Sequence, residues 1–247
     1  MKNPRINIIA LIGARGGSKG IKNKNIQAVG GYPLIAYPIT CAQLVPEIPE
    51  EAVYFSTESG QIRTIAGKFM AETGLIKRPA KYSSDKATDI GWLSHAIETV
   101  EKSGKTVDLI VHLRATTPFI VPFVIDDAIK LFLKNKADSL RSVHPLPESP
   151  YKMYEKRDNY LHSYMGTPIE ETTKPRQSMD IAWVPNGYVD ILRASVIKAG
   201  SLYGEKILAF ETEPVIEVDS QHDLDLLRAT HEDAVMFDYL RSFFPGN

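Results

Sequence analysis

Short apolar runs alternate along the chain with segments of helical period. The apolar runs that predict strands cover residues 6–12, 52–56, 108–113 and 139–143. The segments in which apolar residues recur every three or four positions cover residues 33–45, 62–69, 89–102 and 122–134. This alternation is typical of an α/β fold with a mainly parallel sheet, flanked by helices, of the Rossmann-like kind.

Two parts of this pattern carry more specific expectations. Pro33 is expected to open the first helix, because proline fits its first position, and an apolar stripe follows through Leu34, Ile35, Pro38, Ile39 and Ala42. In the last quarter of the chain we expect a strand over residues 187–192, a helix near Ala194, strands near Ile207 and Val215, and a closing helix from Gln221.

The regular alternation breaks between about residues 146 and 185. Five prolines, at positions 147, 150, 168, 175 and 185, interleave there with tyrosines at 151, 154, 160 and 164. Aromatic residues outside a regular core need a surface to cover, so the segment is either a long surface loop or an arm that packs on another subunit. The pattern alone favours neither.

Length and composition restrict the class of protein. A chain of 247 residues, 43% of them hydrophobic, can bury one sizeable core, so we expect one domain over residues 1–247 with an inserted segment. Lys plus Arg total 29 against 30 Asp plus Glu, which provides no global attraction to nucleic acid or to an anionic membrane. The apolar run before the first charged loop is too short for a signal peptide or a membrane span, so a cytoplasmic protein is expected. The single cysteine, Cys41, excludes an internal disulfide and is expected to be a buried small hydrophobe.

The stretch ALIGARGGSKGIKNKN, residues 10–25, places four glycines, Arg15 and three lysines directly after the first apolar run. A glycine-rich turn leaving a strand lets backbone N–H groups converge on an anion, and nearby cations add charge, so this stretch predicts a phosphate-binding loop. It is not a Walker loop, because the order is Ser18-Lys19-Gly20 rather than Gly-Lys-Ser. The dinucleotide spacing G-x-G-x-x-G is also absent.

Several motifs in the same order resemble the acylneuraminate cytidylyltransferase family, which makes CMP-sialic acid and related CMP-nonulosonic acids. They are IALIGARGGSKGIKNKNI at the N-terminus, RPAKYSSDKAT at 78–88, LRATTPF at 113–119, SPYKMY at 149–154, KPRQ at 174–177, PNGYVDILR at 185–193 and IEVDSQHDL at 216–224. The resemblance spans nearly the whole chain. Gly13 departs from it, because the family loop usually has proline there.

The resemblance implies a reaction and a nucleotide site. In the family, the anomeric hydroxyl of the sugar attacks the α-phosphorus of CTP and expels pyrophosphate, with Mg²⁺ neutralising charge. The residues implied as catalytic are Arg15, Lys19, Lys24 and Asp219. Those implied in nucleotide binding are Ala14, Arg15, Gly16, Gly17, Ser18, Lys19, Asn25, Arg78, Asp85 and Thr88. Where the family has paired hydroxyls, this chain has Thr88 followed by Asp89.

Metal binding needs hard oxygen ligands, and IEVDS offers Glu217 and Asp219. Residues two apart on a strand face the same side, so both carboxylates are expected to converge. Family members commonly carry Asp at both positions, and Asp219 is therefore the expected main Mg²⁺ ligand. The alternative role for Asp219 is that of a helix N-terminal residue ahead of Gln221.

The resemblance also implies a set of residues that bind the acceptor sugar: Arg114, Thr116, Thr117, Asn186, Gly187, Lys152, Arg176 and Gln177. Arg114 stands where many relatives have glutamine, and its guanidinium suits the sugar's carboxylate, although a surface arginine closing a turn fits as well. Asn186 and Gly187 are otherwise an ordinary turn. Lys152, Arg176 and Gln177 fall in the irregular segment, which relatives use as an arm that reaches into a second subunit. The resemblance thus implies a homodimer with arm exchange.

The expected activity is a CTP- and Mg²⁺-dependent cytidylyltransferase acting on a nine-carbon acidic sugar. A CMP-Kdo synthetase, or an inactive nucleotide-binding homologue, remains as an alternative. A metal-dependent glycosyltransferase would need a D-x-D motif in mid-chain, which is absent. The histidines do not cluster in sequence, so His95, His112 and His144 are expected to have isolated core or surface roles.

Overall fold

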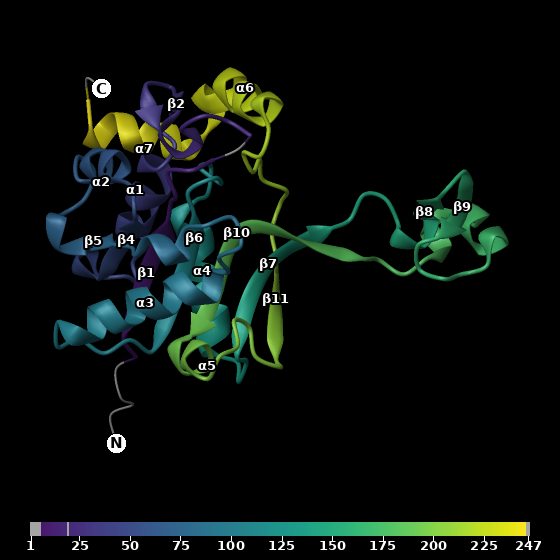
Figure 1. Cartoon of the computed structure of the whole chain (residues 1–247), viewed down its shortest axis with the longest axis horizontal. Coiled ribbons are helices and arrows are strands. Elements are labelled where there is room, and N and C mark those ends of the chain that lie inside the picture. The colour runs from purple at the N-terminus through teal and green to yellow at the C-terminus, as the bar shows by residue number, and fades with distance from the viewer. Residues whose placement is uncertain (1–5, 19, 246–247) are drawn as a thin grey trace.

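The computed structural model describes residues 6–18 and 20–245, which form an α/β body with one projecting segment (Figure 1). The strands are β1 (Ile8–Gly13), β2 (Ala28–Val29), β3 (Tyr32–Pro33), β4 (Val53–Thr57), β5 (Leu75–Lys77), β6 (Leu109–Arg114), β7 (Ser139–Pro145), β8 (Tyr154–Arg157), β9 (Tyr160–Ser163), β10 (Trp183–Arg193) and β11 (Ile207–Glu211). The α-helices are α1 (Ala36–Leu44), α2 (Gly60–Ala66), α3 (Asp89–Lys102), α4 (Pro122–Leu133), α5 (Ala194–Lys198), α6 (Gln221–Thr230) and α7 (Val235–Phe243). Single turns of 3₁₀ helix occur at Lys24–Ile26, Glu50–Ala52, Glu72–Gly74, Ala80–Tyr82, Pro150–Lys152, Ile169–Thr173, Arg176–Ser178 and His231–Asp233.

The main sheet has seven strands in the order β11-β7-β10-β6-β1-β4-β5. β1 pairs in parallel with β4 and β6, β4 with β5, and β7 with β11. β10 runs antiparallel between β6 and β7. The sheet is therefore mixed but mostly parallel, and the carboxyl ends of β1 and β6 lie at the same edge.

Helices cover both faces of this sheet. One face packs against α1, α4, α6 and α7, and contributes the larger apolar cluster, which includes Ile12, Phe55 and Leu113. The other face packs against α3 and α5 through Leu11, Ile110 and their neighbours. Burying both faces explains why β1 and β6 read as continuous apolar runs rather than as alternating ones.

Most regular elements predicted from the sequence are confirmed, and α3 agrees to the residue. Pro33 does not open a helix: it belongs to β3, which pairs with β2 as a small hairpin, and α1 begins three residues later. The expected strand near Val215 is also wrong, because residues 212–219 have no regular structure. β5 was missed, since three residues are too few to show a period.

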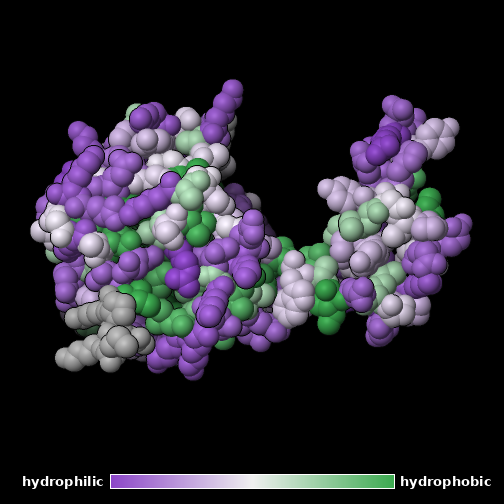
Figure 2. All heavy atoms as spheres, turned by 90° about the horizontal axis from the view of Figure 1, so that it is seen from below, coloured by the Kyte–Doolittle hydropathy of each residue, from purple (hydrophilic) through white to green (hydrophobic). Residues whose placement is uncertain are grey.

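Residues 146–182 leave the body between β7 and β10 and form the projecting segment, which we call the arm (Figure 1). Inside the arm β8 and β9 pair as an antiparallel hairpin, and the Tyr154 hydroxyl lies 2.5 Å from the Thr172 hydroxyl. Several large apolar side chains of the arm are exposed: Tyr160, Leu161, Tyr164, Met165, Ile169 and Ile181. Figure 2 shows a second lobe joined to the body by a narrow neck with apolar residues on it.

No α-helix in the described part of the chain has both the length and the apolar character required to cross a bilayer.

Candidate active site

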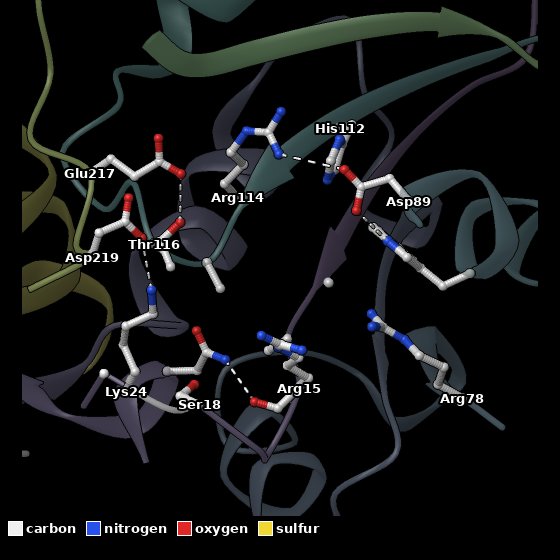
Figure 3. Close-up of a pocket in the computed structure, with 16 residues that line it drawn as sticks. Arg15, Ser18, Lys24, Arg78, Asp89, His112, Arg114, Thr116, Glu217 and Asp219 are labelled. Atoms are coloured by element: carbon white, nitrogen blue, oxygen red, sulfur yellow. Dashed lines mark hydrogen bonds and ion pairs between the residues drawn. The ribbon is translucent and has the colours of Figure 1, made fainter. Parts of the chain in front are cut away.

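A cavity of about 370 Å³ opens at the carboxyl ends of β1 and β6 (Figure 3). Its lining joins the glycine loop to residues from the middle and the far end of the chain: Gly13, Ala14, Arg15, Ser18, Gly20, Lys24, Asn25, Arg78, Asp89, Trp92, His112, Arg114, Ala115, Thr116, Glu217 and Asp219. The carboxyl edge of strands is where open α/β sheets bind ligands. Ten of the residues predicted from the sequence therefore share one cavity.

Gly13 is required by the packing at the start of the loop. A Cβ atom at this position would lie 2.7 Å from Nη2 of Arg78 and 2.8 Å from the ring of Trp92. The Arg78 guanidinium stacks on that indole, with Cζ 4.4 Å from the ring centroid. Burial lowers the pKa of Arg78 to about 10, so the side chain is charged at neutral pH. Gly13 thus makes room for a buried cation at the cavity wall.

Three contacts hold the loop that follows. The Asn25 side-chain amide donates to the Arg15 carbonyl oxygen at 2.9 Å, and Arg15 pairs with Asp85 at 3.0 Å. The Gly16 amide, predicted to face a phosphate, instead donates to the Glu58 carboxylate at 2.7 Å. Glu58 Oε2 is buried and has no hydrogen-bond partner among the described residues. Lys19 lies outside the described residues.

The acidic pair lies opposite the loop (Figure 3). The two residues belong to an irregular segment rather than to the expected strand, and the Val218 amide fixes this segment by donating to the Thr116 carbonyl oxygen at 2.8 Å. Asp219 accepts from Lys24 Nζ at 3.1 Å, and Glu217 accepts from the Thr116 hydroxyl at 3.2 Å. Both residues line the cavity, and the Asp219 side chain is 77% exposed.

This donor set fits a hard divalent cation. Mg²⁺ is commonly held by one or two carboxylates while the remaining positions are filled by water and substrate phosphates. Two carboxylates at the rim of one cavity meet that requirement. Three or more clustered His, Cys, Asp or Glu side chains, as in an all-protein metal cage, do not occur in the described part of the chain.

Arg114 lies between carboxylates on the α3 side of the sheet. Its Nη2 donates to Asp190 Oδ2 at 2.7 Å, and its Nη1 lies 3.9 Å from Asp89. Burial disfavours the charged form of Arg114, but Asp190 and Asp89 outweigh it and raise its pKa. Arg114 is therefore already paired with carboxylates of the protein. In the predicted contact, the sugar's carboxylate would compete with them for the guanidinium.

His112 is not isolated, which corrects the sequence-based prediction. It lines the cavity, lies with Nδ1 3.9 Å from Asp190 Oδ2, and packs edge-on against Trp92. Burial and the neighbouring Arg114 lower the pKa of His112 to about 4, so the ring is neutral at pH 7. Asp89 behaves differently: burial raises its pKa, whereas the hydrogen bond from Trp92 and the charge of Arg114 contribute to a net lowering.

Several predicted residues lie outside the cavity lining. Gly17, Asp85 and Thr88 are exposed residues that do not line it, and Thr117 is fully buried. Asn186 is also buried, and its amide donates to the Thr212 hydroxyl at 2.6 Å. Gly187 has a φ of 68°, and a Cβ atom there would lie 3.0 Å from Glu217 and 3.1 Å from Arg114, so it packs directly behind both.

The remaining predicted sugar contacts, Lys152, Arg176 and Gln177, belong to the arm and do not line this cavity.

Sequence reasoning missed Glu58, Trp92 and Asp190, and it gave Asp89 and His112 no role in the site. Glu58 directly follows β4, which ends at the same sheet edge as β1, so its position was a usable signal. Trp92 is one turn into α3, and no local pattern marks it. Asp190 is a single acidic residue inside an apolar strand, an unusual placement that indicates a buried, paired charge.

Solved structures share the fold of this chain over nearly its whole length. CMP:2-keto-3-deoxy-manno-octonic acid synthetase complexed with CTP superposes with a TM-score of 0.68 over 92% of this chain and 99% of that one, at 17% identity. A 4-diphosphocytidyl-2C-methyl-D-erythritol synthase gives a TM-score of 0.63 over 92% of this chain and 99% of that one, at 11% identity. At these identities the likeness concerns the fold alone.

The sequence itself matches the family described as cytidylyltransferase over residues 9–198. The chain belongs to this family, and its sequence is similar to N-acylneuraminate cytidylyltransferases.

Curated relatives agree with this placement. N-acylneuraminate cytidylyltransferase A of Danio rerio is 31% identical over 88% of this chain and 49% of its own length. Post-translational flagellin modification protein B of Campylobacter coli is 30% identical over 89% of this chain and 93% of its own length. CMP-N,N'-diacetyllegionaminic acid synthase of Campylobacter jejuni is 27% identical, with 89% and 93% covered. The chain thus spans about half the length of the vertebrate relatives and nearly all of the Campylobacter ones.

Proposed function

We propose that this enzyme transfers CMP from CTP to a nonulosonic, sialic-acid-like sugar and releases pyrophosphate. One observation carries the proposal: a single cavity joins the glycine loop after β1 to the acidic pair Glu217 and Asp219, which are about 200 residues away in sequence. A loop with Arg15, Ser18 and Lys24 suits a triphosphate, and the acidic pair suits the cation that accompanies it.

The reaction assigns a task to each side of the cavity. Arg15, Lys24 and the loop amides bind the β- and γ-phosphates and stabilise the negative charge of the leaving pyrophosphate. The loop amide at Gly16 becomes available only if Glu58 releases it. Asp219 and Glu217 would hold Mg²⁺, which supplies charge neutralisation and lowers the pKa of the attacking hydroxyl.

A neutral His112 and a paired Arg114 leave the acceptor side without a strong base. His112, with a pKa of about 4, is a weak proton acceptor at pH 7. The carboxylate of Asp190 is already engaged by two arginines. Proton removal from the sugar hydroxyl is therefore assigned to solvent, and not to a dedicated histidine.

The test compares nucleotides and acids directly. Pyrophosphate release is measured with CTP, UTP, ATP or GTP, Mg²⁺, and N-acetylneuraminic, N,N'-diacetyllegionaminic or pseudaminic acid in turn. The expected result is release with CTP and at least one of these acids. Kdo is assayed beside these acids, and release with Kdo alone would support the alternative of a CMP-Kdo synthetase, since a synthetase of that kind has the same fold. CTP binding without release in any mixture would support an inactive homologue.

The proposal includes a single cytidylyltransferase domain over residues 1–247, whose arm completes the site of a second copy. Support comes from the arm's exposed apolar side chains, which a partner surface would cover, and from the absence of Lys152, Arg176 and Gln177 from the cavity of their own chain.

Arm exchange is tested by mixing two inactive variants. Asp219→Asn disables a chain's own cavity, and Lys152→Met disables what its arm supplies. After the two variants are mixed and allowed to exchange subunits, heterodimers regain one intact site and part of the activity. Lys156→Met, another exposed arm lysine, serves as control and should be active alone. A stable monomer in sedimentation, or no recovery on mixing, contradicts arm exchange.

A further inference from the structure

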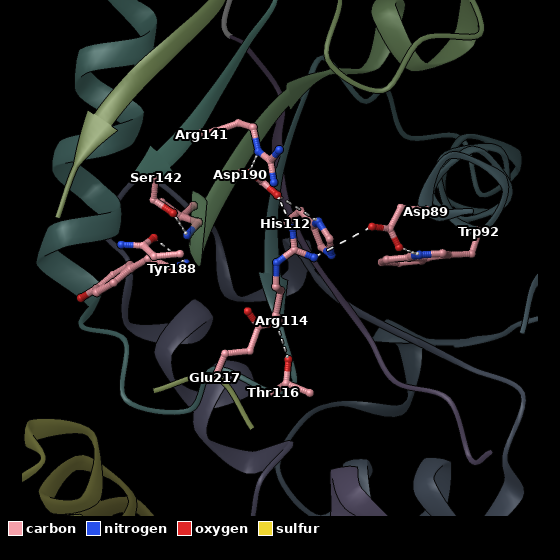
Figure 4. Close-up of polar contacts among 12 residues, drawn as sticks. Asp89, Trp92, His112, Arg114, Thr116, Arg141, Ser142, Tyr188, Asp190 and Glu217 are labelled. Carbon is pink, nitrogen blue, oxygen red and sulfur yellow. Dashed lines mark hydrogen bonds and ion pairs between the residues drawn. The ribbon is translucent and has the colours of Figure 1, made fainter. Parts of the chain in front are cut away.

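A row of polar side chains crosses three neighbouring strands beside the cavity (Figure 4). His112 on β6 is in register with Asp190 on β10, and Asp190 is in register with Arg141 on β7. Residues in register project on the same side of a sheet, and this side is the one that packs on α3 and α5. His112 thus belongs to the cavity lining, whereas Asp190 and Arg141 continue the row beside that lining, on the side away from the glycine loop.

Asp190 joins the two arginines of this row. Its side chain is only 4% exposed, and it accepts from Arg114 Nη2 at 2.7 Å and from Arg141 Nε at 3.0 Å. One buried carboxylate thus accepts from both guanidinium groups. A buried carboxylate with two charged partners is also a rigid element, because both partners lose their alternative positions.

The two arginines differ in how many donors remain free. Arg114 faces a second carboxylate, Asp89, at 3.9 Å. Arg141 uses only Nε, and its two terminal nitrogens have no hydrogen-bond partner in the part of the chain that the structure describes. Its side chain is one-quarter exposed, and its guanidinium stacks on Tyr203 with Cζ 4.3 Å from the ring centroid. The free donors of the row therefore lie at Arg141.

We propose that Arg141 is a specificity-determining residue that binds, through its two terminal NH2 groups, oxygen atoms on the end of the acceptor sugar farthest from the reacting hydroxyl. This inference rests on the proposed function. The reacting hydroxyl must lie near Glu217 and Asp219, at the carboxyl end of β6. Arg141 lies two strands away from β6, a separation of about 10 Å that a nine-carbon sugar can span.

The chemistry of the row restricts what this end of the sugar can be. A planar guanidinium fixed by Asp190 and Tyr203 presents two parallel N–H groups, which suits hydroxyl, carbonyl or carboxylate oxygens and does not suit a methyl group. Because the side chain is already ordered, little rotamer entropy is lost on binding. The substituent recognised at this point is therefore polar.

A purely structural role is the competing explanation, since the Arg141–Asp190 pair also ties β7 to β10. A purely structural role predicts that Arg141 variants unfold more easily. It also predicts that KM for the acid and KM for CTP change equally or not at all. Arg193 offers a matched control: its Nε donates to the Ala137 carbonyl oxygen and its guanidinium stacks on Phe132, but it lies at the other end of β10, in register with Leu109 at the start of β6.

The experiment measures KM for the acid, KM for CTP and kcat in Arg141→Lys and Arg141→Gln, with Arg193→Lys as control. Lysine keeps the charge beside Asp190 and loses the fork, so it remains informative if the glutamine variant folds poorly. The expected result is about a tenfold rise in KM for the acid, from the loss of one charge-assisted contact, with KM for CTP unchanged within about twofold. Arg193→Lys should leave all three values unchanged.

Three results overturn the inference: an unchanged KM for the acid in both Arg141 variants, a parallel rise in both KM values, or a loss confined to kcat. These three results can be told apart from a failure of the proposed function. If the proposed function is wrong, the wild-type chain turns over no acid in the panel, and the inference about Arg141 is then wrong as well.

Discussion

The two sides of the cavity are built in different ways. On the nucleotide side, one continuous segment, residues 13–25, supplies most of the lining. On the proposed acceptor side, His112 and Arg114 line the cavity and Asp190 and Arg141 lie beside them, and only the register of three strands brings the four together. The glycine loop is therefore visible as a motif in the sequence, whereas the proposed acceptor wall depends on which strands are neighbours.

The electrostatics of the two sides also differ. The loop carries cations in partly exposed positions, whose partners Asp85 and Asp219 are themselves half exposed or more. The acceptor wall buries a carboxylate between two arginines. The comparison indicates that substitutions in the wall will act first on stability, and substitutions around the loop first on catalysis.

The largest effect is expected for Asp190→Asn. Removing the buried charge leaves Arg114 and Arg141 close together without their shared counter-ion, which should cost about 3–5 kcal/mol of unfolding free energy. Urea unfolding measures this, with Asp225→Asn on exposed α6 as control, expected within about 0.5 kcal/mol of wild type. Equal stability of the two variants would contradict the account of the acceptor wall.

Asp219→Asn should act on turnover and leave stability unchanged, because this side chain is mostly exposed. We expect pyrophosphate release to fall by about 100- to 1000-fold, the cost of losing a charge that holds the reacting groups. The assay is run over a range of Mg²⁺ concentrations, with Asp225→Asn again as control. Full activity at saturating Mg²⁺ would place the ion elsewhere.

His112→Gln should change how stability depends on pH. Burial and Arg114 hold the pKa of His112 at about 4 in the folded protein, below the ordinary 6.5. The unfolded chain therefore takes up a proton as pH falls below about 6.5, whereas the folded one does not until about 4. Wild-type stability should fall across this window by up to about 3 kcal/mol through this group, and the variant should lack that component.

The measurement is urea unfolding at pH 7 and at pH 4.5 for wild type, His112→Gln and His162→Gln. His162 lies exposed on the arm, so its variant should follow wild type. An identical loss of stability in all three proteins would mean that His112 is not buried in its neutral form.

Gly13→Ala tests the junction between loop and wall. The new Cβ would lie within 3 Å of both Arg78 and Trp92, and we expect a loss of about 1–3 kcal/mol from overpacking. Gly17→Ala in the same loop is the matched control, because a Cβ there meets no atom within 4 Å. Thermal unfolding compares the two, and equal midpoints would show that the stack on Trp92 moves aside freely.

The smallest effect is expected for Glu58→Gln. The amide oxygen can still accept from Gly16, but the negative charge beside the phosphate site disappears. KM for CTP should fall about threefold, by the size of one screened charge interaction. Glu47→Gln, at the opposite end of the sheet, should leave KM unchanged. A rise in KM would mean that the charge of Glu58 is needed to shape the loop.

The sequence predicted the parts of the molecule that local rules determine. Apolar runs located β1 and β6, and the glycine loop located the cavity, because both signals lie within one short stretch. Pro33 was misplaced because a proline that suits a helix start also suits a short strand, and contacts of β3 with β2 decided between the two.

The acceptor wall was largely beyond such rules. Asp190 and Arg141 are 49 residues apart, and their ion pair follows from β10 inserting antiparallel between β6 and β7. No local period encodes that insertion. For the same reason the sequence predicted an isolated role for His112, although it lies next to Asp190 on the neighbouring strand.

The arm's attachment to the body has an evolutionary consequence. Its entry and exit residues, Pro145 and Trp183, are paired partners on adjacent antiparallel strands. A segment inserted between two such partners starts and finishes at the same point in space. It can be lengthened, shortened or exchanged over generations while the seven-stranded sheet keeps its order, so that new assemblies can evolve without redesign of the chemistry.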